Sequence, residues 1–239
     1  MNTLRLCNYL ISENIELIKK TAVRNCHCFG LNSFIINEKP RIRLFIAEPD
    51  CELFQEFDYK NPIIPIHPHK YDDIFSQLEG VMINHIYKVA ESGIKFNSYK
   101  YNRLSNNKSI LELAGTETLS YVGGNRNTTF LTSKQLHTAS LEGDRCSWTI
   151  TETFEDKNFI QVAYHQNLLE REGLYIPMLN PDEYLNDYFE QMLPKKSYTG
   201  FTKCRCGRFY GDQEKQFGAC LQCRRDIPKN NKYNKKYYK

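Results

Sequence analysis

The sequence predicts a mainly β protein, built as a barrel or a sandwich. Short segments with apolar residues at every second position recur between residues 40 and 153, which is the pattern of strands with one buried face. Turn-forming residues separate these segments, and the strand–helix alternation of a parallel sheet is missing. With 239 residues, 41% hydrophobic and 25% charged, the chain can bury one sizeable core and carry an appendage.

Residues 1–39 are expected to form an N-terminal helix and a lead-in to the β domain. Apolar residues recur every three or four positions from Leu4 to Ala22, which predicts an amphipathic helix packed on the domain. The following Cys26-His27-Cys28 contains ligand-type side chains, but no other pair lies close to it in the sequence. We therefore interpret it as a loop with small buried thiols.

Residues 40–194 are expected to hold the strands and one later helix. Alternation begins at Arg41–Ile46, and Glu52–Phe57 is a candidate for another strand. The segment Ser76–Val89 is either one long strand or a hairpin that bends at Glu79-Gly80. Further strands are expected at Lys95–Tyr101, Ser109–Leu113, Glu117–Val122, Thr128–Thr132, Leu136–Leu141 and Cys146–Thr153.

Glycines place the turns between these strands. Gly123-Gly124-Asn125 is expected to be a turn, and Gly143-Asp144 a hairpin turn. His165 is expected in a helix. A second helix is expected to start at Asn180-Pro181, because Asn caps helices and Pro suits their first turn, and to end at Pro194.

The most informative stretch contains two histidines two residues apart, His67 and His69, whose side chains share one face of an extended segment. Asp73 follows His69 after three residues, and Gly80 follows Asp73 after six. This His-x-His-x3-acid-x6-Gly pattern resembles the first metal motif of the cupin superfamily, with Asp73 where that family usually has Glu. The resemblance implies a double-stranded β-helix barrel with flanking helices over residues 40–153 or so.

In cupins a third histidine comes from a later strand, and His137 is the histidine of the corresponding stretch. Here Thr132-Ser133-Lys134 replaces the family's Pro-x-Gly, and Leu141 replaces its Asn. The resemblance implies that His67, His69 and His137 bind Fe(2+) or another divalent metal. It implies for Asp73 the role of fourth ligand or catalytic base. Three histidines alone resemble the thiol dioxygenases of the superfamily. A fourth ligand resembles its oxidases, isomerases and sugar-binding proteins.

Other side chains near these motifs have structural interpretations. His85 on the strand after Gly80 is expected to be a hydrogen-bonded structural residue, with a substrate contact as the alternative. Cys146, Trp148 and Ile150 share one face of their strand by alternation. We expect them to be core residues or the apolar wall of a pocket.

Residues 195–239 are expected to form a small zinc module with a basic tail. Two cysteine pairs, spaced as Cys-x-Cys and Cys-x2-Cys across a short loop, resemble a zinc ribbon: Cys204, Cys206, Cys220 and Cys223. Four thiolates close a tetrahedral Zn(2+) shell, so this zinc is expected to be structural. Metal would supply the folding energy of so small a segment.

Charge singles out the tail as the basic part. Residues 224–239 carry seven basic side chains against one acidic, a net +6, whereas the whole chain is +4 and residues 1–223 therefore sum to −2. Basic and aromatic residues that alternate suit single-stranded nucleic acid. The residues expected to contact it are Arg205, Arg208, Arg224, Arg225, Lys235 and Lys236.

Two functions from different classes remain open. The first is a metal-dependent enzyme, an Fe(2+)-type dioxygenase acting on a small-molecule or peptide substrate. The second is a non-catalytic binding protein whose zinc module docks on nucleic acid or on a protein. Nine cysteines, four of them in metal-type spacing, and no apolar run near the ~20 residues of a membrane span lead us to expect a cytoplasmic or otherwise intracellular protein without membrane contact.

Overall fold

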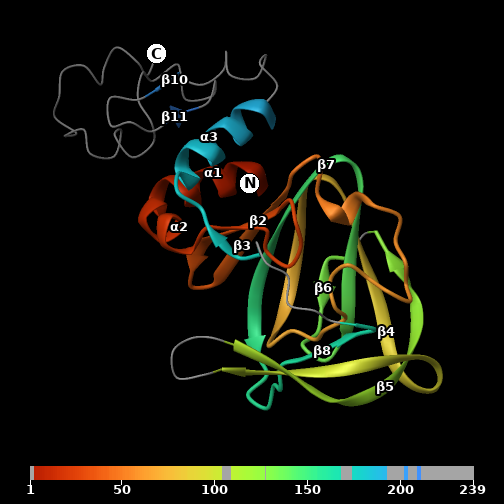
Figure 1. Cartoon of the computed structure of the whole chain (residues 1–239). Helices are drawn as coiled ribbons and strands as arrows, with labels where there is room; N and C mark the ends of the chain where they lie inside the picture. Colours follow the sequence, from red (N-terminus) through yellow and green to blue (C-terminus); the bar gives the residue numbers. More distant parts are fainter. Residues whose placement is uncertain are drawn as a thin grey trace, which may run out of the picture. The chain divides into compact units, whose positions relative to one another are not determined.

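The computed structural model describes residues 3–103, 109–126, 128–167, 174–192, 202–203 and 209–210. The chain divides into two compact units, residues 1–182 and residues 183–239, each of which is considered by itself. The predicted mainly β fold is confirmed, because strands make up most of the first unit (Figure 1). No helix in the described ranges is long and apolar enough to cross a membrane.

The N-terminal stripe forms two helices where the sequence predicts one. α1 (Thr3–Glu13) and α2 (Ile15–Thr21) meet at Asn14, whose side-chain amide donates to the Leu10 carbonyl at 3.0 Å and to the Ile36 carbonyl at 3.1 Å. An Asn that bonds main-chain carbonyls competes with the regular helix ladder. Both helices lie beside β2 (Leu31–Glu38) (Figure 1), and four residues of the predicted apolar stripe are buried: Cys7, Ile11, Ile18 and Ala22.

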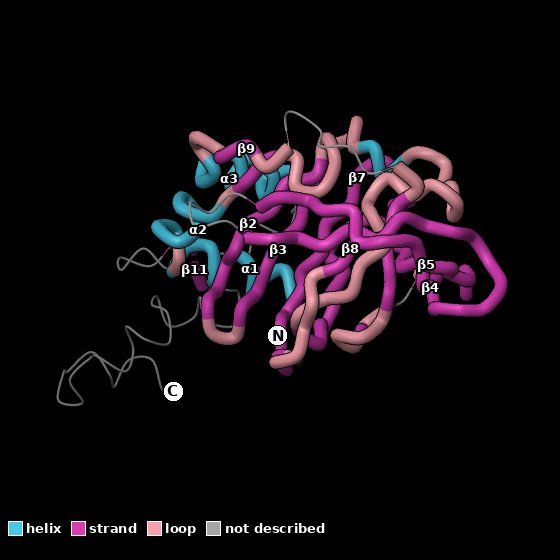
Figure 2. Tube along the Cα trace, turned by 60° about the horizontal axis from the view of Figure 1, so that its bottom comes forward, coloured by secondary structure: helices cyan, strands magenta, loops and turns pink. Residues whose placement is uncertain are grey.

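The first unit contains one antiparallel sheet of nine strands in its described residues. The strands besides β2 are β1 (Val23–Arg24), β3 (Arg41–Ala47), β4 (Tyr71–Arg103), β5 (Ser109–Asn125), β6 (Phe130–Leu131), β7 (Leu136–Glu155), β8 (Val162–His165) and β9 (Ile176–Pro177). The order is β5-β4-β7-β3-β2-β1-β9, and β6 and β8 each pair with β4. Figure 2 shows β2 and β3 running side by side in this sheet.

The long strand β4 organises the sheet. Its first half pairs with β7, and its second half pairs with β5 and β8. Two single bridges lie outside the named strands, one joining Ile66 to Tyr164 of β8 and one joining His67 to His137 of β7. Backbone pairing therefore runs from β7 through the His67 segment to β8, and from β8 back to β4.

Gly80 marks a sharp irregularity within β4, not a hairpin, so the long-strand alternative for this segment is confirmed. Its φ is +66°, and a Cβ there would lie 2.1 Å from the Arg145 carbonyl oxygen, so only glycine fits. The opposing residues of β7 bulge at this point, since Glu79 pairs with Ser147 but Val81 pairs with Glu142.

The predicted hairpin turn at Gly143-Asp144 is wrong for the same reason. The residues before and after it both belong to β7 and both pair with β4, so the chain bulges at Gly143 and continues instead of reversing. Gly143 does have the positive φ, +98°, that a turn glycine would have. A bulge can need this conformation as a turn does, so the residue type alone does not distinguish them.

Three further local predictions are wrong. The predicted strand at Glu52–Phe57 contains a short 3-10 helix, Glu52–Phe54. The predicted turn at Gly123-Gly124-Asn125 is the end of β5, where Gly124 pairs with His85 and leaves room for its ring. The predicted helix around His165 is strand β8. In the last two cases pairing with β4 overrides the local preference.

The main core of the first unit lies between β2, β3, β4 and β7. It contains four buried cysteines and a stacked aromatic pair, Phe45 and Trp148, with ring centroids 5.2 Å apart. A smaller cluster surrounds Phe96, which is fully buried. Burial of this apolar surface is the main term that stabilises the fold.

The second unit is described only in part. α3 (Pro181–Met192) begins at Pro181 as predicted, and it buries Leu185, Tyr188 and Phe189. β10 (Thr202–Lys203) pairs with β11 (Phe209–Tyr210). The predicted helix end at Pro194, the four zinc cysteines and the basic tail lie outside the described residues. The zinc module and the domain division at residues 39 and 194 stay predictions.

Candidate metal centre

One backbone pair places two of the three predicted histidine ligands next to each other. The His67 N–H donates to the His137 carbonyl at 3.0 Å, and the His137 N–H donates back to the His67 carbonyl at 3.1 Å. Side chains of directly paired residues lie on the same face of an antiparallel pair. His69 follows two residues after His67 and returns to that face.

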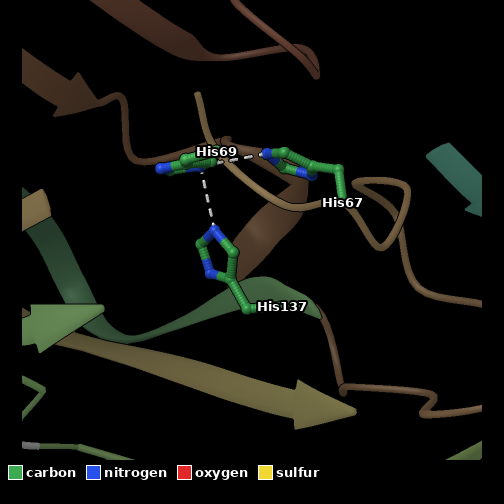
Figure 3. Close-up of side chains that lie close together, drawn as sticks. All are labelled: His67, His69 and His137. Carbon is green, nitrogen blue, oxygen red and sulfur yellow. Dashed lines mark hydrogen bonds between the residues drawn. The ribbon is translucent and has the colours of Figure 1, made fainter. Parts of the chain in front are cut away.

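The three imidazoles converge on one point (Figure 3). Nε2 of His69 lies 3.2 Å from Nε2 of His67 and 3.0 Å from Nε2 of His137. One nitrogen of each ring lies within 4.8 Å of the other two, so the three residues could hold a metal ion. The structure thus brings together the three histidines that the sequence singled out from segments about seventy residues apart.

The opposite nitrogen of each ring contacts a hydrogen-bond acceptor. Nδ1–H of His67 donates to the Pro65 carbonyl at 2.7 Å, and Nδ1–H of His137 donates to Asn84 Oδ1 at 2.9 Å. Nδ1–H of His69 donates to the carboxylate of Asp73. An acceptor at Nδ1 selects the tautomer that leaves Nε2 without a proton, which is how metal-binding histidines are commonly oriented.

Burial favours the neutral form of two of the three rings, His67 and His137. It lowers the pKa of His67 to about 4, with a further contribution from nearby His69, and it lowers the pKa of His137 well below the ordinary range. A neutral imidazole with Nδ1 protonated presents a lone pair at Nε2. Nε2 of His69 lies at hydrogen-bond distance from the other two Nε2 atoms, and a cation placed between the three rings would bind their lone pairs instead.

The spacing of the nitrogens fits a transition metal. Two imidazole nitrogens bound at about 2.1 Å to one ion and at right angles to each other lie about 3.0 Å apart. The observed contacts of 3.0 and 3.2 Å match that arrangement. Imidazole ligands suit Fe, Zn, Cu and Ni and are poor ligands for Mg and Ca.

Asp73, predicted as a fourth ligand or as a base, lies against Nδ1 of His69, on the ring edge away from the shared point. It is 2% exposed and forms part of β4, where it pairs with Glu152 of β7. Its Oδ1 is buried without a hydrogen-bond partner in the described residues. In this arrangement Asp73 orients His69, and the converging atoms are all histidine nitrogens.

A cavity of about 760 Å³ opens beside the triad, which is room for a small organic ligand. Apolar side chains form much of its wall, including Trp148 and Ile150, which confirms the pocket-wall interpretation of that strand face. Cys146, on the same face, is a buried core residue.

Several residues of this cavity were not predicted from the sequence. His27 lines it beside His67, with ring centroids 6.0 Å apart, and its Nδ1 lies 2.7 Å from the hydroxyl of Tyr175. Burial lowers the pKa of His27 to about 3. Asn84 was also missed, although its i, i+2 alternation with Met82 on β4 was a usable signal for an inward-facing polar residue.

His85 has the structural role that the sequence predicts. Its Nδ1 lies 3.0 Å from the Tyr121 hydroxyl and its Nε2 lies 2.7 Å from Ser140 Oγ, and it stacks on Phe57. It does not line the cavity of the triad. The residues predicted to contact zinc or nucleic acid lie outside the described part of the chain.

Fold and site together define a mainly β protein with a three-histidine group that could hold a metal ion above a ligand-sized cavity. No protein-family model matches the chain, and no curated protein matches it. Among solved structures, one match is the CBM22-1 xylan-binding domain from Paenibacillus barcinonensis Xyn10C, at 8% identity over 58% of this chain and 84% of that chain. The TM-score is 0.14, so we draw nothing from it.

Proposed function

We propose that the chain is a metal-dependent enzyme of cupin type, in which His67, His69 and His137 hold one Fe(2+) ion and the adjacent cavity receives an organic substrate. The observation that supports this most is the convergence of three Nε2 atoms whose Nδ1 partners are all acceptors. The ring of pairing from β7 through His67 and β8 to β4 is the arrangement that a small barrel requires. Both features agree with the cupin resemblance of the motif.

The chain's own residues supply the rest of the site. Three neutral protein ligands leave coordination positions free, and a redox-active ion there would bring substrate and dioxygen together. Asp73 and Asn84 fix the rings of His69 and His137 through their Nδ1–H groups. The apolar wall limits the water that reaches the reacting groups. The reaction class that we propose is a dioxygenation.

The test compares the metal content and oxygen chemistry of full-length protein and triad variants. Protein reconstituted with Fe(2+) without oxygen is exposed to nitric oxide, which binds ferrous iron only at an open position. We expect the paramagnetic iron–nitrosyl signal in wild type and its loss in the double variant His67→Ala, His69→Ala. Absence of the signal from iron-loaded wild type would refute an open iron site.

A matched control separates the triad from histidine content in general. His165 bonds the Pro62 carbonyl and does not line the cavity, so His165→Gln should keep the signal and the full metal content. The cysteines of residues 204–223 should hold their zinc in every variant. Loss of metal from the control as well would show that the variants act through unfolding.

A second candidate function rests on the charge distribution in the sequence. We propose that residues 204–239, with their excess of basic residues, bind single-stranded nucleic acid and that the first unit does not. Full-length protein should bind single-stranded RNA, more weakly as salt rises, whereas a chain ending at Lys195 should not bind. Equal binding by both chains would contradict this assignment.

A further inference from the structure

Three neighbouring strands form one wall of the cavity, and their register determines which side chains lie together on it. Arg43 of β3 pairs with Ile150 of β7, which pairs in turn with Phe75 of β4. Two residues along, Phe45 of β3 pairs with Trp148 of β7. Residues paired across antiparallel strands lie on one face, and all five line the cavity. Among these five residues Arg43 is the charged one; Arg41 and Glu152, which lie further along β3 and β7, also line the cavity and pair with each other.

Two polar groups of this wall are buried N–H donors that the described part of the chain leaves without an acceptor. The atoms are Arg43 Nε and Trp148 Nε1. Nearly all buried donors in native proteins have a partner, because leaving one unpaired forfeits its hydration without return. Both atoms are covered in this structure, so an acceptor in the cavity would reach them only after a side-chain shift, and Arg43 is the residue that offers further N–H groups.

Arg43 forms no ion pair at contact distance in the described residues, although the carboxylate of Glu152 lies close enough to interact with its charge. The other two basic residues on the cavity have carboxylates, since Arg41 Nε lies 3.6 Å from Glu152 and Lys70 pairs with Glu155. Among the described residues no carboxylate lies within 4.0 Å of Arg43. A guanidinium presents two parallel N–H groups that match the two oxygens of a carboxylate.

The triad strengthens this preference for an anion. Three neutral imidazoles leave a divalent ion with its full charge, and Asp73 is the carboxylate that contacts them. A ligand that shares the cavity with that ion and with Arg43 is favoured if it carries negative charge. Phe45, Phe75 and Ile150 favour an apolar body behind the charged group.

We propose that the cavity binds a small organic carboxylate, whose oxygens accept hydrogen bonds from the Arg43 guanidinium and whose apolar body lies along Phe75 and Ile150 beside the Trp148 ring. That such a carboxylate is the substrate rests on the function proposed above. Its binding does not, because Arg43 lines the cavity whether or not the triad holds iron.

The test uses an optical probe that the sequence provides. Trp148 is the one tryptophan of the chain, so its fluorescence reports this cavity wall alone. Full-length protein is titrated to millimolar concentrations with benzoate, 3-phenylpropanoate and octanoate, and with the neutral amide of each. We expect saturable fluorescence changes with at least one acid and about tenfold weaker binding of its amide, which corresponds to one strong interaction.

Variants then assign the binding to Arg43. Arg43→Gln should lower the affinity for the acid about tenfold or more and leave the amide unchanged, whereas Arg43→Lys should lie between wild type and Arg43→Gln. Arg126→Gln is the matched control, because Arg126 is exposed and pairs with Glu142 away from this cavity. The comparison of acid with amide in wild type needs no variant, so misfolding of Arg43→Gln would not remove the test.

The outcomes separate this inference from the iron site. Acid binding that survives in the variant His67→Ala, His69→Ala supports the carboxylate site even if no iron is found. Equal binding of acids and amides, equal binding by wild type and Arg43→Gln, or no change with any of the acids would overturn it. An iron site without acid selectivity would leave the proposed function standing alone.

Discussion

Replacing Asp73 by Asn tests which of two roles this carboxylate has. Asn keeps the size of the side chain and one acceptor oxygen for Nδ1–H of His69, but it removes the charge. Its amide nitrogen can take the place of Oδ1, which has no partner in the described residues. If Asp73 orients His69, the variant should still bind one ion at the triad, with affinity lower by about 10–100-fold. That loss equals about 1.4–2.7 kcal/mol.

The assay is competition between the protein and a chromophoric chelator for Co(2+), whose visible spectrum also reports the ligands. The absorbance of Co(2+) bound by the cysteines is corrected for by subtracting the spectrum of the double variant His67→Ala, His69→Ala. Asp72→Asn is the control, because Asp72 accepts from the Ser133 N–H and does not touch the triad. Complete loss of the site in Asp73→Asn would refute our reasoning and restore Asp73 as a ligand. Unchanged affinity would show that its contact with His69 is irrelevant.

We make three further predictions, two from single contacts and one from the cysteine pattern. Asn84→Leu should weaken metal binding about 10-fold without removing it, because Nδ1–H of His137 loses its acceptor; the chelator competition above measures this. Gly80→Ala should destabilise the protein by about 3 kcal/mol or more in denaturant unfolding, because the new Cβ meets the Arg145 carbonyl. Gly143→Ala should cost less, since its nearest neighbour is 3.9 Å away, and equal losses would contradict the argument. Chelation of zinc should allow proteolysis after Lys195 or Lys196 and leave the first unit intact, whereas resistance would count against a metal-folded module. That module is the one expected of Cys204, Cys206, Cys220 and Cys223.

Two of the three histidines of the triad could be predicted from a local sequence pattern. His67 and His69 share a face through the two-residue period of extended chain, which requires no knowledge of the sheet. His137 could be paired with them only through the family resemblance, since nothing in its own neighbourhood indicates an ion. Gly80 was also expected through the family resemblance. Its φ of +66° at a bulge explains why glycine is needed at this position.

The rest of the site depends on strand register, which the sequence does not display. In the sequence Arg43 is one of the polar residues of an ordinary alternating strand. Only its pairing with Ile150 places it on the cavity wall. In the sequence Asn84 is one polar residue within a long strand. Its role becomes visible only in the structure, where its Oδ1 accepts from His137. The misassigned turn at Gly143 has the same origin, because a bulge and a turn draw on the same residue types and differ only in what pairs with the flanking residues.

The segment that carries His67 is joined to two strands by single backbone bridges, and this affects how the site responds to metal. One bridge joins His67 to β7, and the other joins Ile66, which is fully buried, to β8. Proline at position 65 has no N–H for a ladder, but its carbonyl accepts the proton of His67 Nδ1. An ion shared by His67 and His137 would therefore link this segment to β7 beside an existing backbone pair. Because such an ion would bind only the folded arrangement, its binding energy would add directly to the stability of the fold.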